Sequence, residues 1–328
     1  MRKTIFEQIK ERVSFASELK RLDLLIRDKD GVRIEAPKSN IIISENDYKI
    51  NFISLEDFFD TFVFKKWKAR GTCINCKDLR EALCFEDILE SEEPSLEDTI
   101  SFCEYVANLV KLYNKACLKE GVRFYPTDVT VAISANLNSI MDWLNQKMVF
   151  FEKEERVLIT EKNAAVTAVA ECVDEELAYQ IVKYNHYTLK GDILKKKEIL
   201  LKLGSELEPK RGQLNSKLGD NIFFMLNNLN IRHNNKSKKD KNYKEYVAKM
   251  KKNKLEEWYD ELYQMMLLAM LELEQVERNQ KINELKLISN KKELSDSNLN
   301  QIALIFSDII YITVADNREM LPKRCHSA

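Results

Sequence analysis

The chain has 328 residues, of which 45% are hydrophobic, and a formal net charge of −1 at pH 7. This apolar share excludes a chain too polar to bury a core, and the near-neutral charge excludes a protein that binds polyanions over its whole surface. The length favours two domains. Because the chain contains only 7 Gly and 5 Pro, we expect few turns and long helices in a mainly α protein.

The first half is predicted to combine helices with short strands. Apolar residues at helical spacing predict a helix over residues 3–29. Short β-branched runs separated by turn signals predict a small antiparallel meander, with strands at residues 32–35, 41–43 and 48–53.

Helices are predicted to resume at Ser54, an expected N-cap with Asp57 three residues later. Helical segments are expected at residues 54–71, 76–90 and 95–121. A strand and a helix follow within 123–146, and alternation over 147–162 predicts a β-hairpin. We expect residues 1–162 to form a mixed α+β domain that senses a trigger or binds a partner.

The remaining residues, 163–328, are predicted to form a helical domain. Its helical segments are expected at residues 163–188, 190–209, 219–235, 243–288 and 295–321. Asp174 and Asp220 are the expected N-caps of two of these helices. The segment 259–277 is apolar on more than one side, so it forms either core or a dimer surface.

The cysteines and motifs favour a protein of the cytoplasm without a cofactor. The seven cysteines are irregularly spaced, and the only CxxC, Cys73 and Cys76, has no histidine near it, so we expect no metal site. The sequence contains no P-loop, dinucleotide-binding, HExxH or EF-hand pattern. We see neither a signal peptide nor an apolar run that could span a membrane, and we therefore expect reduced thiols and a cytoplasmic location.

Residues 223–235, FFMLNNLNIRHNN, contain five asparagines within a predicted helix. Asparagine disfavours helix interiors because its side chain competes for backbone hydrogen bonds, and such conflicts occur at caps, turns or functional sites. The simpler interpretation is that Asn234 and Asn235 end the helix and the other asparagines face solvent. If the helix continues, Arg232 and His233 point about 100° apart. They could then serve one site only if the helix breaks, or if a second subunit supplies one of them.

The residue types in this stretch suit RNA cleavage. Arg232 offers a planar, permanently charged fork for a phosphate, and His233 can move protons near neutral pH. The surrounding side chains could bind RNA or support the site, namely Asn227, Asn228, Asn230, Asn234, Asn235, Lys236, Lys238 and Lys239. From these residue types alone, an exposed Arg and His on a solvated loop is the simpler interpretation.

The segment LNNLNIRHNN, late in one helix and before another, resembles the HEPN superfamily of helical ribonucleases over at most residues 163–290. The resemblance implies a metal-independent ribonuclease of an abortive-infection, toxin–antitoxin or other anti-phage defence system, often dimeric with two motifs facing one cleft. Arg232 matches the family's arginine, and His233 matches its polar second position. A second histidine is replaced by Ser237, Lys238 and Lys239. The site is therefore either a variant that uses His233 or a HEPN-like domain that does not cleave.

Two other functions remain open. One is a non-enzymatic protein of a defence system whose helical half dimerises or docks a partner. The other is a sequence-tolerant nucleic-acid binder that uses the lysine-rich loop. His186, between Tyr184 and Tyr187, is either a packed residue or a partner of Arg232.

Overall fold

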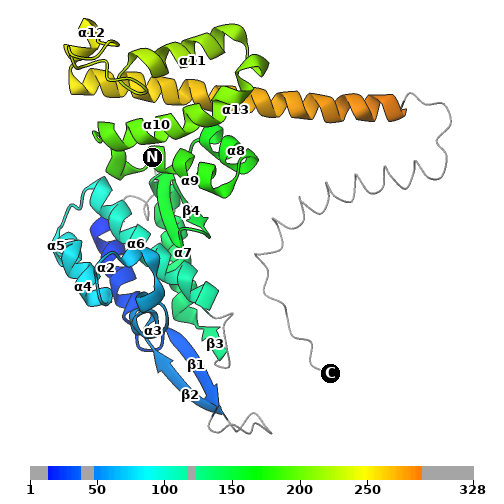
Figure 1. Cartoon of the computed structure of the whole chain (residues 1–328). Helices are drawn as coiled ribbons and strands as arrows, with labels where there is room; N and C mark the ends of the chain where they lie inside the picture. The colour runs from blue at the N-terminus through cyan, green and yellow to red at the C-terminus, as the bar shows by residue number, and fades with distance from the viewer. Residues whose placement is uncertain (1–13, 38–47, 117–122, 290–328) are drawn as a thin grey trace, which may run out of the picture. The chain divides into compact units, whose positions relative to one another are not determined.

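Helices form most of the described chain in the computed structural model, which confirms the mainly α class with a small β content (Figure 1). The structure describes residues 14–37, 48–116 and 123–289. By its internal contacts the chain forms two compact units, residues 1–271 and residues 272–328. The predicted strand at 41–43 and the predicted last helix at 295–321 lie outside the described residues.

The first described helix, α2 (Phe15–Ile26), begins within the predicted helix 3–29, of which residues 3–13 lie outside the described residues. Ser14 has extended backbone, and its hydroxyl accepts a hydrogen bond from the Ser17 N–H at 3.1 Å. The prediction of one continuous helix is therefore wrong at Ser14, because a serine N-cap interrupts the apolar spacing. The helix ends three residues before the predicted position.

A three-stranded antiparallel sheet follows, with the strand order β2-β1-β3. It consists of β1 (Val32–Pro37), β2 (Tyr48–Ile53) and β3 (Arg123–Pro126). The predicted strands at 32–35 and 48–53 are confirmed as β1 and β2, which pair directly and antiparallel. A meander would place the strand at 41–43 between them. Strand β3 comes from a distant segment and pairs with the other edge of β1, opposite Val32–Glu35.

Helix α3 (Leu55–Phe62) begins as predicted, because the Ser54 hydroxyl accepts the Asp57 N–H at 3.0 Å. It ends earlier than predicted, and short 3₁₀ turns carry the chain to Gly71. The predicted helix 76–90 is two helices, α4 (Cys76–Ala82) and α5 (Phe85–Glu90), because Cys84 has a φ of 54°. A left-handed residue cannot continue a right-handed helix.

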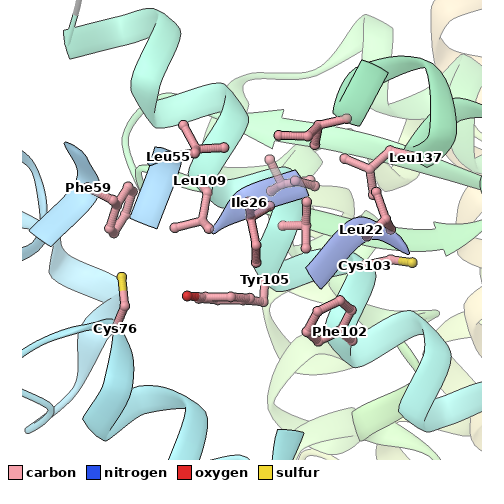
Figure 2. Close-up of a cluster of buried hydrophobic side chains, with 14 of the residues drawn as sticks. Leu22, Ile26, Leu55, Phe59, Cys76, Phe102, Cys103, Tyr105, Leu109 and Leu137 are labelled. Atoms are coloured by element: carbon pink, nitrogen blue, oxygen red, sulfur yellow. The ribbon is translucent and has the colours of Figure 1, made fainter. Parts of the chain in front are cut away.

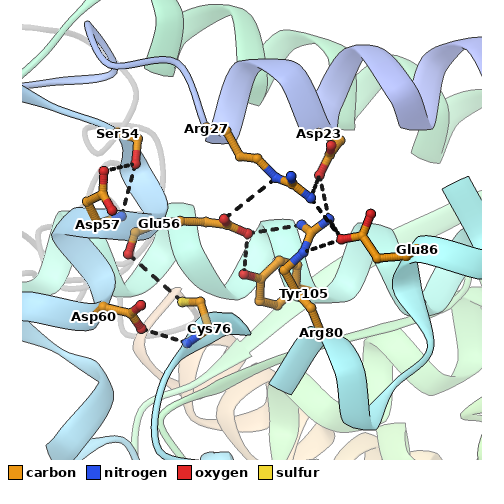
Figure 3. Close-up of polar contacts among 10 residues, drawn as sticks. All are labelled: Asp23, Arg27, Ser54, Glu56, Asp57, Asp60, Cys76, Arg80, Glu86 and Tyr105. Carbon is orange, nitrogen blue, oxygen red and sulfur yellow. Dashed lines mark hydrogen bonds and ion pairs between the residues drawn. The ribbon is translucent and has the colours of Figure 1, made fainter. Parts of the chain in front are cut away.

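Arg80 of α4 holds the first helices together through a network of ion pairs (Figure 3). Its side chain is buried and lies within 3.0 Å of carboxylate oxygens of Asp23, Glu56 and Glu86. The Tyr105 hydroxyl donates to Glu56 at 2.6 Å. These contacts join α2, α3, α4 and α5 to the long helix α6 (Leu96–Ala116).

The hydrophobic core of this part surrounds α6 (Figure 2). Phe102 and Leu109 of α6 are buried there. Side chains from α2, α3 and α7 (Asp128–Trp143) pack around them, among them Leu22, Phe59 and Leu137. Full burial of such a side chain stabilises the fold by about 1.5–3 kcal/mol.

The predicted β-hairpin is confirmed as β4 (Gln146–Phe151) paired with β5 (Arg156–Glu161). The buried Asn108 of α6 fixes β5 in place, because its Oδ1 accepts the Val157 N–H at 2.8 Å. Strand β5 therefore lies directly against α6, and both contribute to the cavity described below.

Helices alone follow in the rest of the first unit. The predicted segment 163–188 forms α8 (Ala164–Cys172) and α9 (Glu175–Tyr184), with Asp174 as the predicted N-cap. Helix α10 (Ile193–Leu207) also agrees with prediction. Helix α11 (Ser216–Asn228) begins before Asp220, because Asn215 caps it by accepting the Lys217 and Leu218 N–H groups. Asp220 pairs with Arg211 instead.

The predicted helix 243–288 is also divided, into α12 (Glu245–Ala248) and α13 (Lys252–Ser289). Up to Leu271, the apolar stripe of α13 mostly belongs to the core, and the side chains of Leu262, Tyr263, Met266 and Leu267 are buried. In the second unit, the described residues 272–289 are helical, with Ile282, Leu285 and Leu287 exposed. Among the described helices, none is both long enough and apolar enough to cross a membrane.

Candidate functional site

The predicted helix through Arg232 breaks before it reaches that residue. Helix α11 ends at Asn228, and Asn230 has a φ of 60°, a conformation that asparagine tolerates better than most residues. The Arg232 N–H then donates to the carbonyl of Leu226 at 2.9 Å, which closes the helix end. A continuing helix would place Asn227, Asn230 and Asn234 on one face, but they share no helix face because α11 ends at Asn228. Arg232 and His233 could serve one site if the helix breaks or if a second subunit supplies one of them, and the structure contains the break.

Two of the candidate asparagines hold the loop after α11. The Asn230 N–H donates to Asn235 Oδ1 at 2.6 Å, and the Asn235 N–H donates to Asn230 Oδ1 at 3.1 Å. Asn235 is fully buried, and its Nδ2 donates to the Asn242 carbonyl at 2.7 Å. These two amides are therefore engaged by the loop itself. Asn234 and Asn235 do not end the helix, as the simpler interpretation expected, because α11 already ends at Asn228.

The other candidate asparagines differ in their contacts. Asn234 Oδ1 accepts the Ser237 N–H at 3.2 Å, and Asn228 Nδ2 donates to the Phe224 carbonyl at 2.8 Å. The half-exposed Asn227 makes no side-chain hydrogen bond with another described residue. Asn227 is consequently the amide of this group that the fold leaves available.

Arg232 faces the protein rather than solvent. Its guanidinium forms an ion pair with Glu208, which follows α10, and lies 5.2 Å from the centre of the buried Phe223 ring. Gly204 on α10 allows this approach, because a Cβ there would lie 2.9 Å from Leu226 and 3.7 Å from the guanidinium. Arg232 thus ties the end of α11 to α10, and a phosphate would have to compete with Glu208 for it.

His233 and the lysines after it face solvent. His233, Lys236, Lys238 and Lys239 are exposed, and none of their side chains pairs with a carboxylate within the described ranges. Lys197 of α10 is half-buried, and its pKa is lowered by burial and then by the charge of Lys236. Unneutralised positive charge therefore gathers beside His233. We call residues 232–239 the basic loop.

His186 does not meet Arg232. Its Nε2 lies 2.8 Å from Glu104 on α6, and its Nδ1 lies 2.8 Å from the Thr188 hydroxyl. The side chain is buried in the wall of a cavity that also includes Arg156 and Lys183. Sequence reasoning did not identify Glu104, Arg156 or Lys183, because no local motif joins residues so distant in the chain.

The cysteines that the structure describes do not form a metal centre. Cys76 is buried, and burial raises the pKa of its thiol, while Cys73 is partly exposed. Within residues 14–37, 48–116 and 123–289, no group of three or more His, Cys, Asp or Glu side chains is placed to hold a metal ion.

No protein-family model, curated protein or solved structure matches this chain.

Proposed function

We propose that this protein binds RNA through the basic loop and cleaves it there, as a HEPN-like ribonuclease of a prokaryotic defence or toxin system. The observation that carries the proposal is the break of α11 at Asn228. It leaves His233 exposed beside Lys236, Lys238 and Lys239, whose charges no described carboxylate neutralises. Exposed, unneutralised lysines bind phosphate by charge and release counterions.

His233 would act on the proton transfers of RNA cleavage. Attack of a ribose 2′-oxygen on the adjacent phosphorus forms a 2′,3′-cyclic phosphate and expels the 5′-oxygen of the next nucleotide. The 2′-hydroxyl loses a proton in this step and the leaving oxygen gains one. One histidine can perform one of these transfers directly, and water or the basic loop of a second copy would perform the other. A homodimer with two facing loops suits this requirement.

Arg232 would stabilise the charge on the phosphate once its ion pair with Glu208 opens. The half-exposed Asn227 lies at the end of α11, the helix that precedes Arg232, and its side-chain amide could donate a hydrogen bond to RNA. The mixed residues 1–162 would sense a trigger or bind a partner protein.

The test compares wild-type protein with His233→Ala. Both are expressed in bacteria, with and without phage challenge, and total RNA is separated on a gel. We expect RNA fragments with cyclic phosphate ends from the wild type and intact RNA from His233→Ala. Lys249→Ala is the matched control, because Lys249 is exposed but pairs with Glu245 at 2.6 Å. Intact RNA in every sample, or equal cleavage by wild type and His233→Ala, would refute catalysis by His233.

A second candidate function is binding without catalysis. It is favoured by the contacts of Arg232 with other residues of the protein, an ion pair with Glu208 and the Phe223 ring beneath its guanidinium. In that case Arg232 only supports the fold, and the helical half binds nucleic acid or a partner protein. Binding of RNA that weakens steeply with salt but leaves the RNA intact would identify this function.

A further inference from the structure

The cavity beside His186 lies away from the basic loop. It has a volume of about 310 Å³ and is walled by the 3₁₀ turns around Trp67, α4, α6, β5, α9 and the turn after α9. This volume is at the lower end of the range for small-molecule pockets, about 300–1,000 Å³. The ligand it could hold is therefore small.

Glu104 organises one wall of the cavity. Its Oε2 accepts the Ile159 N–H at 2.9 Å and lies 2.8 Å from His186 Nε2, and its Oε1 lies 3.6 Å from Arg156. Because Thr188 contacts the other nitrogen of the His186 ring, the ring is fixed at both ends. His186 is thus a positioning residue that holds the shape of the wall.

Positive charge exceeds negative charge in the cavity. Arg156 and Lys183 both line it, whereas Glu104 is the carboxylate among the lining residues. The Arg156 Nε–H is buried and has no hydrogen-bond acceptor in the part of the chain that the structure describes. Burial, and then the charge of Arg156, lowers the pKa of Lys183, which forms no ion pair within the described ranges. Arg156 has one carboxylate near it, Glu104 at 3.6 Å, and the Lys183 Nζ lies 5.3 Å from the centre of the Tyr179 ring. The two half-buried cations therefore exceed the one lining carboxylate by one charge, which a bound anion would balance.

Aromatic rings form another part of the cavity wall. Trp67 is buried and fixed by a hydrogen bond of 2.8 Å from its Nε1 to the Glu155 carbonyl. Tyr179 and Tyr187 also line the cavity, and the Tyr187 ring centre lies 4.5 Å from that of His186. Stacking of a nucleobase on an aromatic side chain contributes about 1–3 kcal/mol.

We propose that this cavity binds a small anion that carries an aromatic ring, of the class of nucleoside monophosphates. The anionic group would lie against Arg156 and Lys183, and the ring would lie among Trp67, Tyr179 and Tyr187. This site is independent of the proposed RNA cleavage, and it is built jointly by residues of the mixed half and by α9 with the turn after it.

The test uses Trp67 as the reporter in the full-length chain. Trp143 and Trp258, both partly exposed, are changed to Phe, so that the fluorescence of Trp67 alone is measured during titration. The probes are the four ribonucleoside 5′-monophosphates and inorganic phosphate. We expect a saturable change with at least one nucleotide, and an affinity about tenfold lower in Lys183→Gln, the loss of about 1.4 kcal/mol of a charged contact.

The controls keep the experiment interpretable. Lys20→Gln is the matched control, because Lys20 is an exposed lysine on α2 outside the cavity, and it is expected to bind like the parent. Lys183→Gln removes an unpaired charge, so its folding should be intact, and near-ultraviolet circular dichroism checks this. Arg156→Lys is the second variant, which keeps the charge and removes the planar fork.

Three results would overturn the proposal. The first is no saturable binding of any nucleotide, and the second is equal affinity in the parent and both cavity variants. The third is loss of binding in Lys236→Gln/Lys238→Gln/Lys239→Gln but not in Lys183→Gln, which would place the nucleotide on the basic loop. If inorganic phosphate binds as tightly as the nucleotides, the assignment of an aromatic ligand is wrong.

Discussion

Asn230 and Asn235 hold each other's backbone amides through their side-chain oxygens, at 2.6 and 3.1 Å. Side chains that satisfy backbone groups across a turn replace the hydrogen bonds that the ended helix no longer supplies. The basic loop is consequently a defined structure, in which His233 and Asn234 project between the two anchoring asparagines.

Asn235→Ala is expected to lower the free energy of unfolding by about 2–4 kcal/mol, because it leaves the half-buried Asn230 N–H and Asn242 carbonyl without the partners that the Asn235 side chain supplies. Urea denaturation measures this change. Asn234→Ala, which removes one exposed hydrogen bond, should cost less than about 1 kcal/mol. Equal losses in the two variants would show that the reciprocal contact does not stabilise the loop.

The lysines of the basic loop should contribute to RNA binding through charge alone. Replacing Lys238 and Lys239 together by Gln is expected to reduce the slope of log K against log salt by about 1.4, at about 0.7 per phosphate contact on a single strand. Fluorescence anisotropy with a labelled single-stranded RNA at several salt concentrations measures the slope. The paired Lys249→Gln serves as the control, and a slope that Lys238→Gln/Lys239→Gln leaves unchanged would exclude these lysines from the RNA contact.

Glu208→Gln tests whether Arg232 is free to bind phosphate. The substitution removes the carboxylate that competes for the guanidinium, so RNA affinity should rise about two- to tenfold, the range of a modest charge-assisted contact. Anisotropy titration at fixed salt measures it. Glu206→Gln changes an exposed carboxylate two residues away and controls for net charge. If affinity rises equally in both variants, Arg232 does not bind RNA.

The contact of Glu86 with Arg80 should appear in the acid stability of the protein. The hydrogen bond from Arg80 lowers the pKa of Glu86 below its ordinary 4.5. A lowered folded-state pKa adds stability above the ordinary pKa, and this stability is lost as the pH falls through the lowered pKa. Wild type should therefore exceed Glu86→Gln in unfolding free energy at pH 7, and the difference should shrink below pH 4.5. A difference that is constant with pH would contradict the assigned cause. Chemical denaturation from pH 7 downward measures it.

The sequence predicted those features whose cause is local. Ser54 and Asp174 were identified as N-caps because a side chain two or three residues from its backbone partner needs no tertiary information. The break at Cys84 was missed, since a left-handed cysteine has no compositional signal. The N-cap predicted at Asp220 is instead Asn215, and because aspartate and asparagine both cap helices, residue type alone does not fix where α11 begins.

In the candidate site, too, the sequence predicts features with a local cause and misses contacts between distant segments. The asparagines pointed correctly to a local conflict, but the partners of Asn235 lie five and seven residues away across a turn. The meeting of Glu104, Arg156 and His186 depends on β5 packing on α6, so that no spacing in the sequence could reveal it.

The pairing of β3 with β1 affects how the chain is made. Strand β1 leaves the ribosome long before Arg123–Pro126, the segment that completes its second edge. Until then the nascent chain presents an open strand edge, the kind of surface on which aggregation begins. Synthesis that stalls within α6 would leave this edge unprotected, so a chaperone that shields nascent chains should affect the yield of soluble protein.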